Sequence, residues 1–500
     1  MTASRYRRSA SRACIPSVRA SANFSPGETF TGNAADQYRH LPAFARGVER
    51  GRAVMAGEAD PFQREPLPAA PELHRSPSGR YVALTGGPAP EHLGALVGRH
   101  GTAEVWLTPT ALAAWGLPAE LPRGDQRDAP HPWITAALAD GWAANTAGEL
   151  RPWLRIWRPG TDHEATISVP SWDRSGPWHR CADQPAELLA SLERFSELLG
   201  LAWSHSGAIT SDRLLRATHA RRGGLRHAAT ERTPLREPDE HDFVWRRPAD
   251  DRERDATWCH GWDLNGMYLG AASSLALPTG APVHLAGPLP VDRRPGWWRI
   301  DPPEPDDGMP DPYRPRQVLG RRRSTDRTVW VTTSVAQLAG TALEAWVWPE
   351  HHQHLAAWYR TLRDARTALM SEGGGPALAA VKAVYRAGIG RLGSSRRSTA
   401  DELEQPEWRA QLIGTARARL YRRLEQLAAP PVAVNVDAAW FLLPEADPAK
   451  AAELLGLPVG DGLGQFRHIG RIDAHEAREI LATPGNDAPV LNALTTAAKA

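Results

Sequence analysis

Two aspartates stand at the ends of apolar stretches, where a carboxylate could serve metal-dependent chemistry. Asp437 lies between Pro-Pro-Val-Ala-Val-Asn-Val and Ala-Ala-Trp-Phe-Leu-Leu, a pattern that predicts two strands joined by a turn. Asp263 follows another apolar stretch, in Trp-Asp-Leu-Asn-Gly-Met-Tyr-Leu-Gly at 262–270. In phosphoryl transfer, metal ions held by such carboxylates clamp the attacking and leaving oxygens. Asp263 and Asp437 are therefore candidates for a nucleotidyl-transfer site that binds metal weakly.

A third segment, Val-Lys-Ala-Val-Tyr-Arg-Ala-Gly-Ile-Gly-Arg-Leu-Gly-Ser at 381–394, predicts a helix between the two aspartates. Lys382, Arg386 and Ile389 are spaced i, i+4, i+7 and would share one face of that helix. Two positive charges on this face could contact phosphate. A solvated helix face is the simpler reading of the same pair.

In this order, the three segments resemble the motifs of family B DNA polymerases, most closely the protein-primed branch, over about residues 255–445. The first segment is similar to Asp-x-Asn-Ser-Leu-Tyr-Pro, and Asp263, Asn265 and Tyr268 match. The second is similar to Lys-x3-Asn-Ser-x-Tyr-Gly, in which Lys382 and Gly390 match. The resemblance implies that Tyr268, Lys382, Arg386 and Gly390 bind nucleotide or phosphate.

The chain departs from the family at its third motif. Family B polymerases carry two aspartates there, separated by one residue, and the second position here is Ala439. Losing about 4 kcal/mol of transition-state stabilisation slows a reaction roughly a thousandfold. We therefore expect a catalytically degenerate polymerase-like protein with no cofactor, and Mg²⁺ only if activity survives. We also expect Ala439→Asp to place a carboxylate opposite Asp263.

A later helix, expected at about 407–428, carries apolar residues on one side and arginines on the other. Near a polymerase-like cleft these arginines would attract DNA phosphates, although a solvated face is the default. The candidate DNA-binding residues are Arg409, Arg417, Arg419, Arg422 and Arg423.

The elements expected around these residues make an α+β and α/β multidomain chain. Apolar alternation predicts strands at 81–84, 102–107, 153–157, 165–169 and 201–204, and an amphipathic helix is expected at 183–199 with Gly200 as its stop. A surface loop is expected at 290–326, and a helix at 376–392 with Pro376 in its first turn. The resemblance implies a ribonuclease H-like exonuclease-type domain followed by a polymerase palm and fingers domain. No Asp-x-Glu pair lies on the strands expected for the exonuclease, and Asp212 alone could not hold two metals, so that domain is expected to be inactive. The expected divisions are a disordered basic region at 1–76, the exonuclease-like domain at 77–220, a charged connector at 221–256, palm and fingers at 257–445, and a thumb remnant at 446–500.

Composition limits the partners and the compartment. The chain has 500 residues and a net charge of +2, so any binding of nucleic acid must come from local patches. Three cysteines form no disulfide framework, which is typical of a cytoplasmic protein, here expected at the nucleoid. No apolar run reaches the length of a membrane span, so no membrane partner is expected.

Several tryptophan-containing segments resemble actinobacterial telomere-associated proteins of linear replicons. They lie at 150–159, 202–207, 347–349 and 358–366, and the segment 431–437 adds to the resemblance. This resemblance implies DNA ends or single-stranded regions as partners, and possibly a terminal protein or a polymerase. Residues 1–76 lack the paired-helix pattern of the helix-turn-helix module with which such proteins commonly begin. The first hypothesis is a DNA-binding, catalytically degenerate adaptor in replication or end maintenance. The alternatives are an active divergent protein-primed polymerase or deoxynucleotidyl transferase, and a structural protein without DNA contact.

Overall fold

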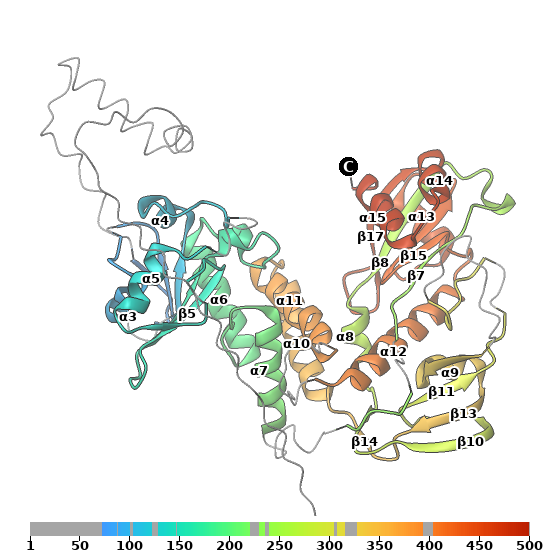
Figure 1. Ribbon diagram of the computed structural model, residues 1–500. Coiled ribbons are helices and arrows are strands. Elements are labelled where there is room, and N and C mark those ends of the chain that lie inside the picture. The colour runs from blue at the N-terminus through green and yellow to red at the C-terminus, as the bar shows by residue number, and fades with distance from the viewer. Residues whose placement is uncertain are drawn as a thin grey trace, which may run out of the picture. The chain divides into compact units, whose positions relative to one another are not determined.

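The computed structural model describes residues 73–87, 89–100, 104–122, 129–146, 148–220, 230–235, 240–304, 308–315, 328–393 and 404–499. All of them belong to one compact unit, residues 68–500. Within this described part, the strands form sheets of six, four, two and five strands in a mixed α/β arrangement of several parts (Figure 1). The basic region predicted at 1–76 lies outside the described residues, except that its end forms β1 (Leu73–Arg75).

The six-stranded sheet has the order β1-β2-β3-β6-β5-β4. Its remaining strands are β2 (Tyr81–Leu84), β3 (Glu104–Leu107), β4 (Ala143–Ala144), β5 (Trp153–Trp157) and β6 (Glu164–Ser168). The short helices of this region are α3 (Leu93–His100), α4 (Pro109–Ala114) and α5 (Pro132–Ala139). The strands β2, β3 and β6 run parallel, and the β6–β5–β4 edge is antiparallel. The alternation of apolar residues predicted four of these strands to within two residues, while the exonuclease-type assignment stays a prediction.

Helix α6 (Pro185–Leu199) packs on this sheet through an apolar stripe that includes Leu188, Leu192 and Phe195. Gly200 ends the helix in the left-handed conformation, at φ 69°, which a glycine adopts without steric cost. Both features were predicted. The strand predicted at 201–204 is wrong, because this segment forms an irregular connection to α7 (Gly207–Ala220).

Helix α7 packs against α11 (Pro376–Leu392), which also contacts α6 and α10 (Ala356–Ser371). The close approach occurs at Gly388, where an added Cβ atom would collide with the hydroxyl of Ser211. The bounds of α11 are those predicted, with Pro376 in its first turn, where a missing N–H costs no hydrogen bond. The helices therefore link the six-stranded sheet to the element that carries Lys382 and Arg386.

A five-stranded antiparallel sheet has the order β17-β8-β16-β15-β7. Its strands are β7 (Val244–Arg246), β8 (Trp258–Leu264), β15 (Ala433–Asn435), β16 (Ala438–Leu443) and β17 (Phe466–Asp473). Helices α13 (Pro448–Leu455), α14 (Ala474–Ala482) and α15 (Asp487–Ala497) complete this part of the chain.

The strand pairing in this sheet corrects two of the predicted domain boundaries. Residues 244–246, expected in a charged connector, form β7 because Trp245 is buried and Arg246 makes a buried ion pair with Asp487 at 2.8 Å. Residues 466–473, expected in a separate thumb remnant, form β17 and pair with β8 along its whole length. Strand pairing between distant segments is not visible in either local pattern.

The four-stranded antiparallel sheet has the order β10-β13-β11-β12. Its strands are β10 (Val283–Pro290), β11 (Gly296–Ile300), β12 (Val329–Thr332) and β13 (Thr341–Val347), with α9 (Thr333–Ala339) beside them. The two-stranded sheet joins β9 (Leu277–Pro278) and β14 (His351–His352). The surface loop predicted at 290–326 is wrong at β11, where Trp297 and Trp298 are buried.

Helix α12 (Pro406–Leu424) contacts α8 (Met267–Ala271), α9 and β12, and Figure 1 shows it crossing between the five-stranded and four-stranded sheets. Most of its residues are buried, on several sides of the helix. A helix buried on several sides keeps few positions for solvated charges. The two-sided pattern of apolar residues and arginines predicted for this helix is therefore only partly correct.

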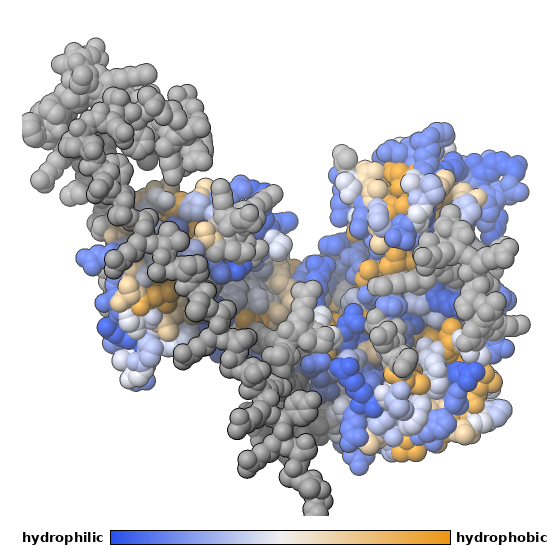
Figure 2. All heavy atoms as spheres, viewed as in Figure 1, coloured by the Kyte–Doolittle hydropathy of each residue, from blue (hydrophilic) through white to orange (hydrophobic). Residues whose placement is uncertain are grey.

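The described residues contain no helix that is both long and apolar enough to span a membrane. On the face shown in Figure 2, apolar residues form separate patches between polar ones.

Candidate functional site

The hairpin between β15 and β16 carries Asp437 in its two-residue turn. Val436, the first turn residue, has a φ of 63°, a left-handed conformation that costs a β-branched residue about 1–3 kcal/mol. Neighbouring strands hold the turn, since Val436 N–H donates to Phe243 O at 2.7 Å and Leu264 N–H donates to Asp437 O at 2.8 Å. This arrangement fixes Asp437 beside the end of β8.

The hairpin brings the two predicted carboxylates together. The carboxyl group of Asp437 lies beside that of Asp263 on β8. Burial, and then the charge of Asp263, raise the pKa of Asp437 to about 7, because both disfavour its ionised form. Near neutral pH, Asp437 is therefore protonated in a substantial fraction of the molecules. The structure therefore brings these two residues together.

Ala439 does not face this pair, contrary to expectation. Ala438 lies directly opposite Asp263, and Ala439 lies opposite Trp262. Side chains alternate between the two faces of a strand, so Ala439 points into the core, where it is fully buried. A carboxylate at residue 439 would enter the core rather than the site.

A cleft with a volume of about 450 Å³ surrounds the two carboxylates. Predicted residues Lys382 and Arg386 line it from α11. Three further basic residues that sequence reasoning missed also line it: Arg366 of α10, Arg467 of β17 and Lys499. Five basic side chains thus surround two acidic ones, and the cleft attracts anions.

The basic residues of the cleft differ in their partners. Arg366 is buried, and its Nη2 donates to Asp461 O at 2.7 Å, while its Nε has no acceptor among the described residues. Arg467 Nη2 lies 3.3 Å from Asp263 Oδ2. Burial, and then the charges of Arg467, Arg366 and Arg386, lower the pKa of Lys382. Positive charge is therefore in excess here even where one ion pair forms.

Only some of the other predicted nucleotide-binding residues line the cleft. Tyr268 of α8 lines the cleft and its hydroxyl donates to Asp242. Gly390 is exposed and does not line the cleft. Ile389, which stands at the family's tyrosine position, is buried, whereas Tyr385 of the same helix lines the cleft. The helical spacing alone could not show whether residue 385 or residue 389 faces the cleft.

The five arginines of α12 do not form one solvent face, and none of them lines the cleft. Arg417 is buried, ion-paired with Glu240, and donates to Pro312 O at 2.9 Å. Arg419 donates to Gly270 O at 2.6 Å, and Arg423 donates to Gly464 O. Arg409 packs against Gly393, and only Arg422 of the five is exposed. Most of these arginines tie the helix to its neighbours, which a count of charges cannot reveal.

The donor set of the cleft does not suit a divalent metal. Magnesium takes near-octahedral oxygen coordination, usually with carboxylates free to bind it. Here the carboxylate of Asp263 is ion-paired with Arg467, and that of Asp437 is buried beside Asp263. Among the residues that the structure describes, no group of three or more His, Cys, Asp or Glu side chains is placed to hold a metal.

Two of the cavities in the described part of the chain lie at the six-stranded sheet. One, of about 540 Å³, is lined by Glu104, Glu164 and Arg155, and burial raises the pKa of Glu104 to about 7. Asp212, the candidate exonuclease carboxylate, does not line it and instead pairs with Arg391 of α11 at 3.1 Å. The carboxylates of this cavity are therefore other residues than Asp212.

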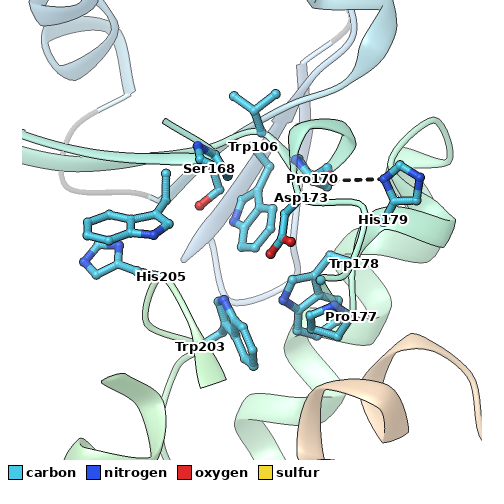
Figure 3. Close-up of a pocket in the computed structure, with 13 residues that line it drawn as sticks. Trp106, Ser168, Pro170, Asp173, Pro177, Trp178, His179, Trp203 and His205 are labelled. Atoms are coloured by element: carbon cyan, nitrogen blue, oxygen red, sulfur yellow. Dashed lines mark hydrogen bonds between the residues drawn. The ribbon is translucent and has the colours of Figure 1, made fainter. Parts of the chain in front are cut away.

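The second cavity lies among aromatic rings. Figure 3 shows Trp106, Trp178 and Trp203 around it, with the carboxylate of Asp173. Its volume is about 30 Å³, well below the roughly 150 Å³ of an engineered apolar cavity that holds benzene.

The family described as "Domain of unknown function (DUF8841)" matches residues 93–206, which include the whole lining of the aromatic pocket. No curated protein matches the chain. Among solved structures, Phi29 DNA polymerase with primer–template DNA and incoming nucleotide is 11% identical, with a TM-score of 0.44, over 77% of this chain and 79% of that one. Phi29 DNA polymerase with single-stranded DNA is 12% identical, with a TM-score of 0.42, over 77% and 78%. The chain is thus remotely similar to these DNA polymerase structures, at a level too low to transfer a function.

Proposed function

We propose that this protein binds DNA through the cleft at Asp263 and Asp437 and does not transfer nucleotides. One observation carries the proposal, the excess of five basic over two acidic side chains around the cleft. Phosphate contacts by Lys and Arg supply most sequence-independent affinity for nucleic acid. The net charge of the chain is only +2, so this local concentration of positive charge does not simply reflect a basic composition.

Within this proposal, the protein acts as an adaptor in replication or end maintenance of a linear or mobile replicon. The resemblance of its motifs to protein-primed polymerases, and of its tryptophan-containing segments to telomere-associated proteins, supports DNA ends or single-stranded regions as the target. A terminal protein or a polymerase would be the partner that it positions. The degenerate third motif supports a binding role rather than a catalytic one.

Fluorescence anisotropy with single-stranded and tailed DNA over a salt series tests the proposal. The double variant Lys382→Gln/Arg386→Gln should bind more weakly, and its slope of log affinity against log salt should fall by about 1.4, for two lost contacts to single strands. Lys450→Gln is the matched control, because it removes an exposed charge of α13 outside the cleft. Absence of binding at about 50 mM salt would remove the proposal.

A second candidate function, nucleotidyl transfer, is favoured by the meeting of Asp263 and Asp437. It requires a further carboxylate in place of the family's second aspartate, and residue 439 lies in the core. Primer extension with Mg²⁺ or Mn²⁺ separates the two functions. Incorporation that Asp437→Ala abolishes would establish catalysis, and no incorporation is expected.

A further inference from the structure

The end of β17 brings a guanidinium to the carboxylate that a metal ion would need. Arg467 lies directly opposite Asp263 in the pairing of β17 with β8, so both side chains project from the same face. Arg467 Nη2 is 3.3 Å from Asp263 Oδ2. The Arg467 side chain remains about half exposed, at 49%, so part of its guanidinium is open to the cleft that it lines.

The surrounding charges oppose a metal ion at the same place. A divalent cation beside Asp263 would have to displace Arg467 and would meet Arg366, Lys382 and Arg386, which line the same cleft. Like charges in a partly buried site repel strongly because screening by solvent is weak there. A bound anion would instead be attracted by all four side chains.

Arg366 adds an unsatisfied donor beside the cleft that it lines. The residue is only 3% exposed, and its buried Nε–H has no acceptor among the described residues. Buried polar groups are nearly always hydrogen-bonded, so the positive charge of this guanidinium is only partly compensated by its protein neighbours. Guanidinium groups match the oxygens of phosphate in charge and in geometry.

We propose that the Arg467 guanidinium takes the place of a divalent cation in this cleft, so that the cleft binds phosphate groups without metal. This inference rests on the proposed binding function and specifies its chemistry. A guanidinium neutralises phosphate charge and donates hydrogen bonds, but it has no open coordination position for an attacking hydroxyl. The cleft therefore holds the phosphates of a nucleotide or of a DNA strand and leaves them intact.

Calorimetric titration of the full chain with inorganic triphosphate, a deoxynucleoside triphosphate and a single-stranded oligonucleotide tests this inference, each in EDTA and in excess MgCl₂. The wild type should bind in EDTA at least as tightly as in Mg²⁺. Arg467→Gln should weaken binding in EDTA on the order of tenfold, as expected for one lost charge-assisted hydrogen bond. Arg467→Lys should retain part of the affinity. Arg471→Gln, on the same strand but outside the cleft lining, should bind as the wild type does.

A second readout does not depend on phosphate. With Asp263 released, Arg467→Gln should gain thermal stabilisation by Mn²⁺ that the wild type lacks, because a ligand that binds only the folded state raises its stability. Binding that requires Mg²⁺ in the wild type would overturn the inference, as would unchanged EDTA binding in Arg467→Gln. Triphosphate binding without DNA binding would refute only the DNA-binding function, and absence of both would refute the two together.

Discussion

Replacing Ala439 with aspartate restores the family's third motif in sequence but should not restore it in space. Ala439 is fully buried opposite Trp262, whereas Ala438 lies opposite Asp263 at the cleft. A carboxylate at 439 has no partner in that core and would remain protonated. At pH 7, holding an aspartate protonated about 3 units above its ordinary pKa costs about 4 kcal/mol. Ala439→Asp should therefore lose about that much folding free energy.

The loss should depend on pH with a definite sign. Burial raises the native-state pKa of the new carboxyl above its unfolded value of about 3.9, so the native state binds the extra proton. Stability then falls as pH rises from about 4 towards the raised native pKa. Urea unfolding at pH 5, 6 and 7 measures this, with Ala439→Asn as the uncharged control of similar shape. The asparagine variant should be destabilised by an amount that does not change with pH.

Ala438→Asp is the companion variant. Its carboxylate would enter the cleft beside Asp263 but also among Lys382, Arg386 and Arg467, so its destabilisation at pH 7 should be below that of Ala439→Asp. Stabilisation of Ala439→Asp by Mn²⁺, or equal stability of Ala439→Asp and the wild type across the pH series, would refute the assigned register. In that case residue 439 would face the cleft, as the motif alone suggested.

Three further outcomes follow from the contacts described above. Arg417→Met should destabilise the protein by about 3–5 kcal/mol in urea, because Glu240 is left buried without its cationic partner; a loss below about 1 kcal/mol would contradict the buried ion pair. Because the pKa of Asp437 is raised, the contribution of this residue to the wild-type free energy of unfolding falls between about pH 4 and about pH 7. The stability of Asp437→Asn relative to the wild type should therefore increase as pH rises. A stability difference that stays constant with pH would show that this carboxyl is not buried against a like charge. Gly388→Ala should cost about 1–3 kcal/mol by separating α11 from α7 at Ser211, measured by thermal unfolding, and an unchanged midpoint would refute the close approach.

Local sequence determined most of the elements. Apolar alternation predicted the strands at 153–157 and 81–84, and the periodic stripe of α6 ended at Gly200 as its left-handed conformation requires. The same patterns placed Asp263 and Asp437 at strand ends, and the resemblance of their segments to family B polymerase motifs implied that they lie together. These properties depend on neighbours within a few residues or on a motif order already present in the chain.

The tertiary structure alone decided which side chains share the cleft. Arg467 reaches Asp263 because β17 pairs with β8 across about two hundred residues of chain, and no local pattern records that pairing. A shift of one residue separates Ala438 in the cleft from Ala439 in the core, since strand side chains alternate between faces. Arg417 reads as a surface charge in sequence, yet Glu240 from a distant segment makes its burial possible. Charge and motif suggested phosphate chemistry, but strand register and packing decided which charged side chains line the cleft.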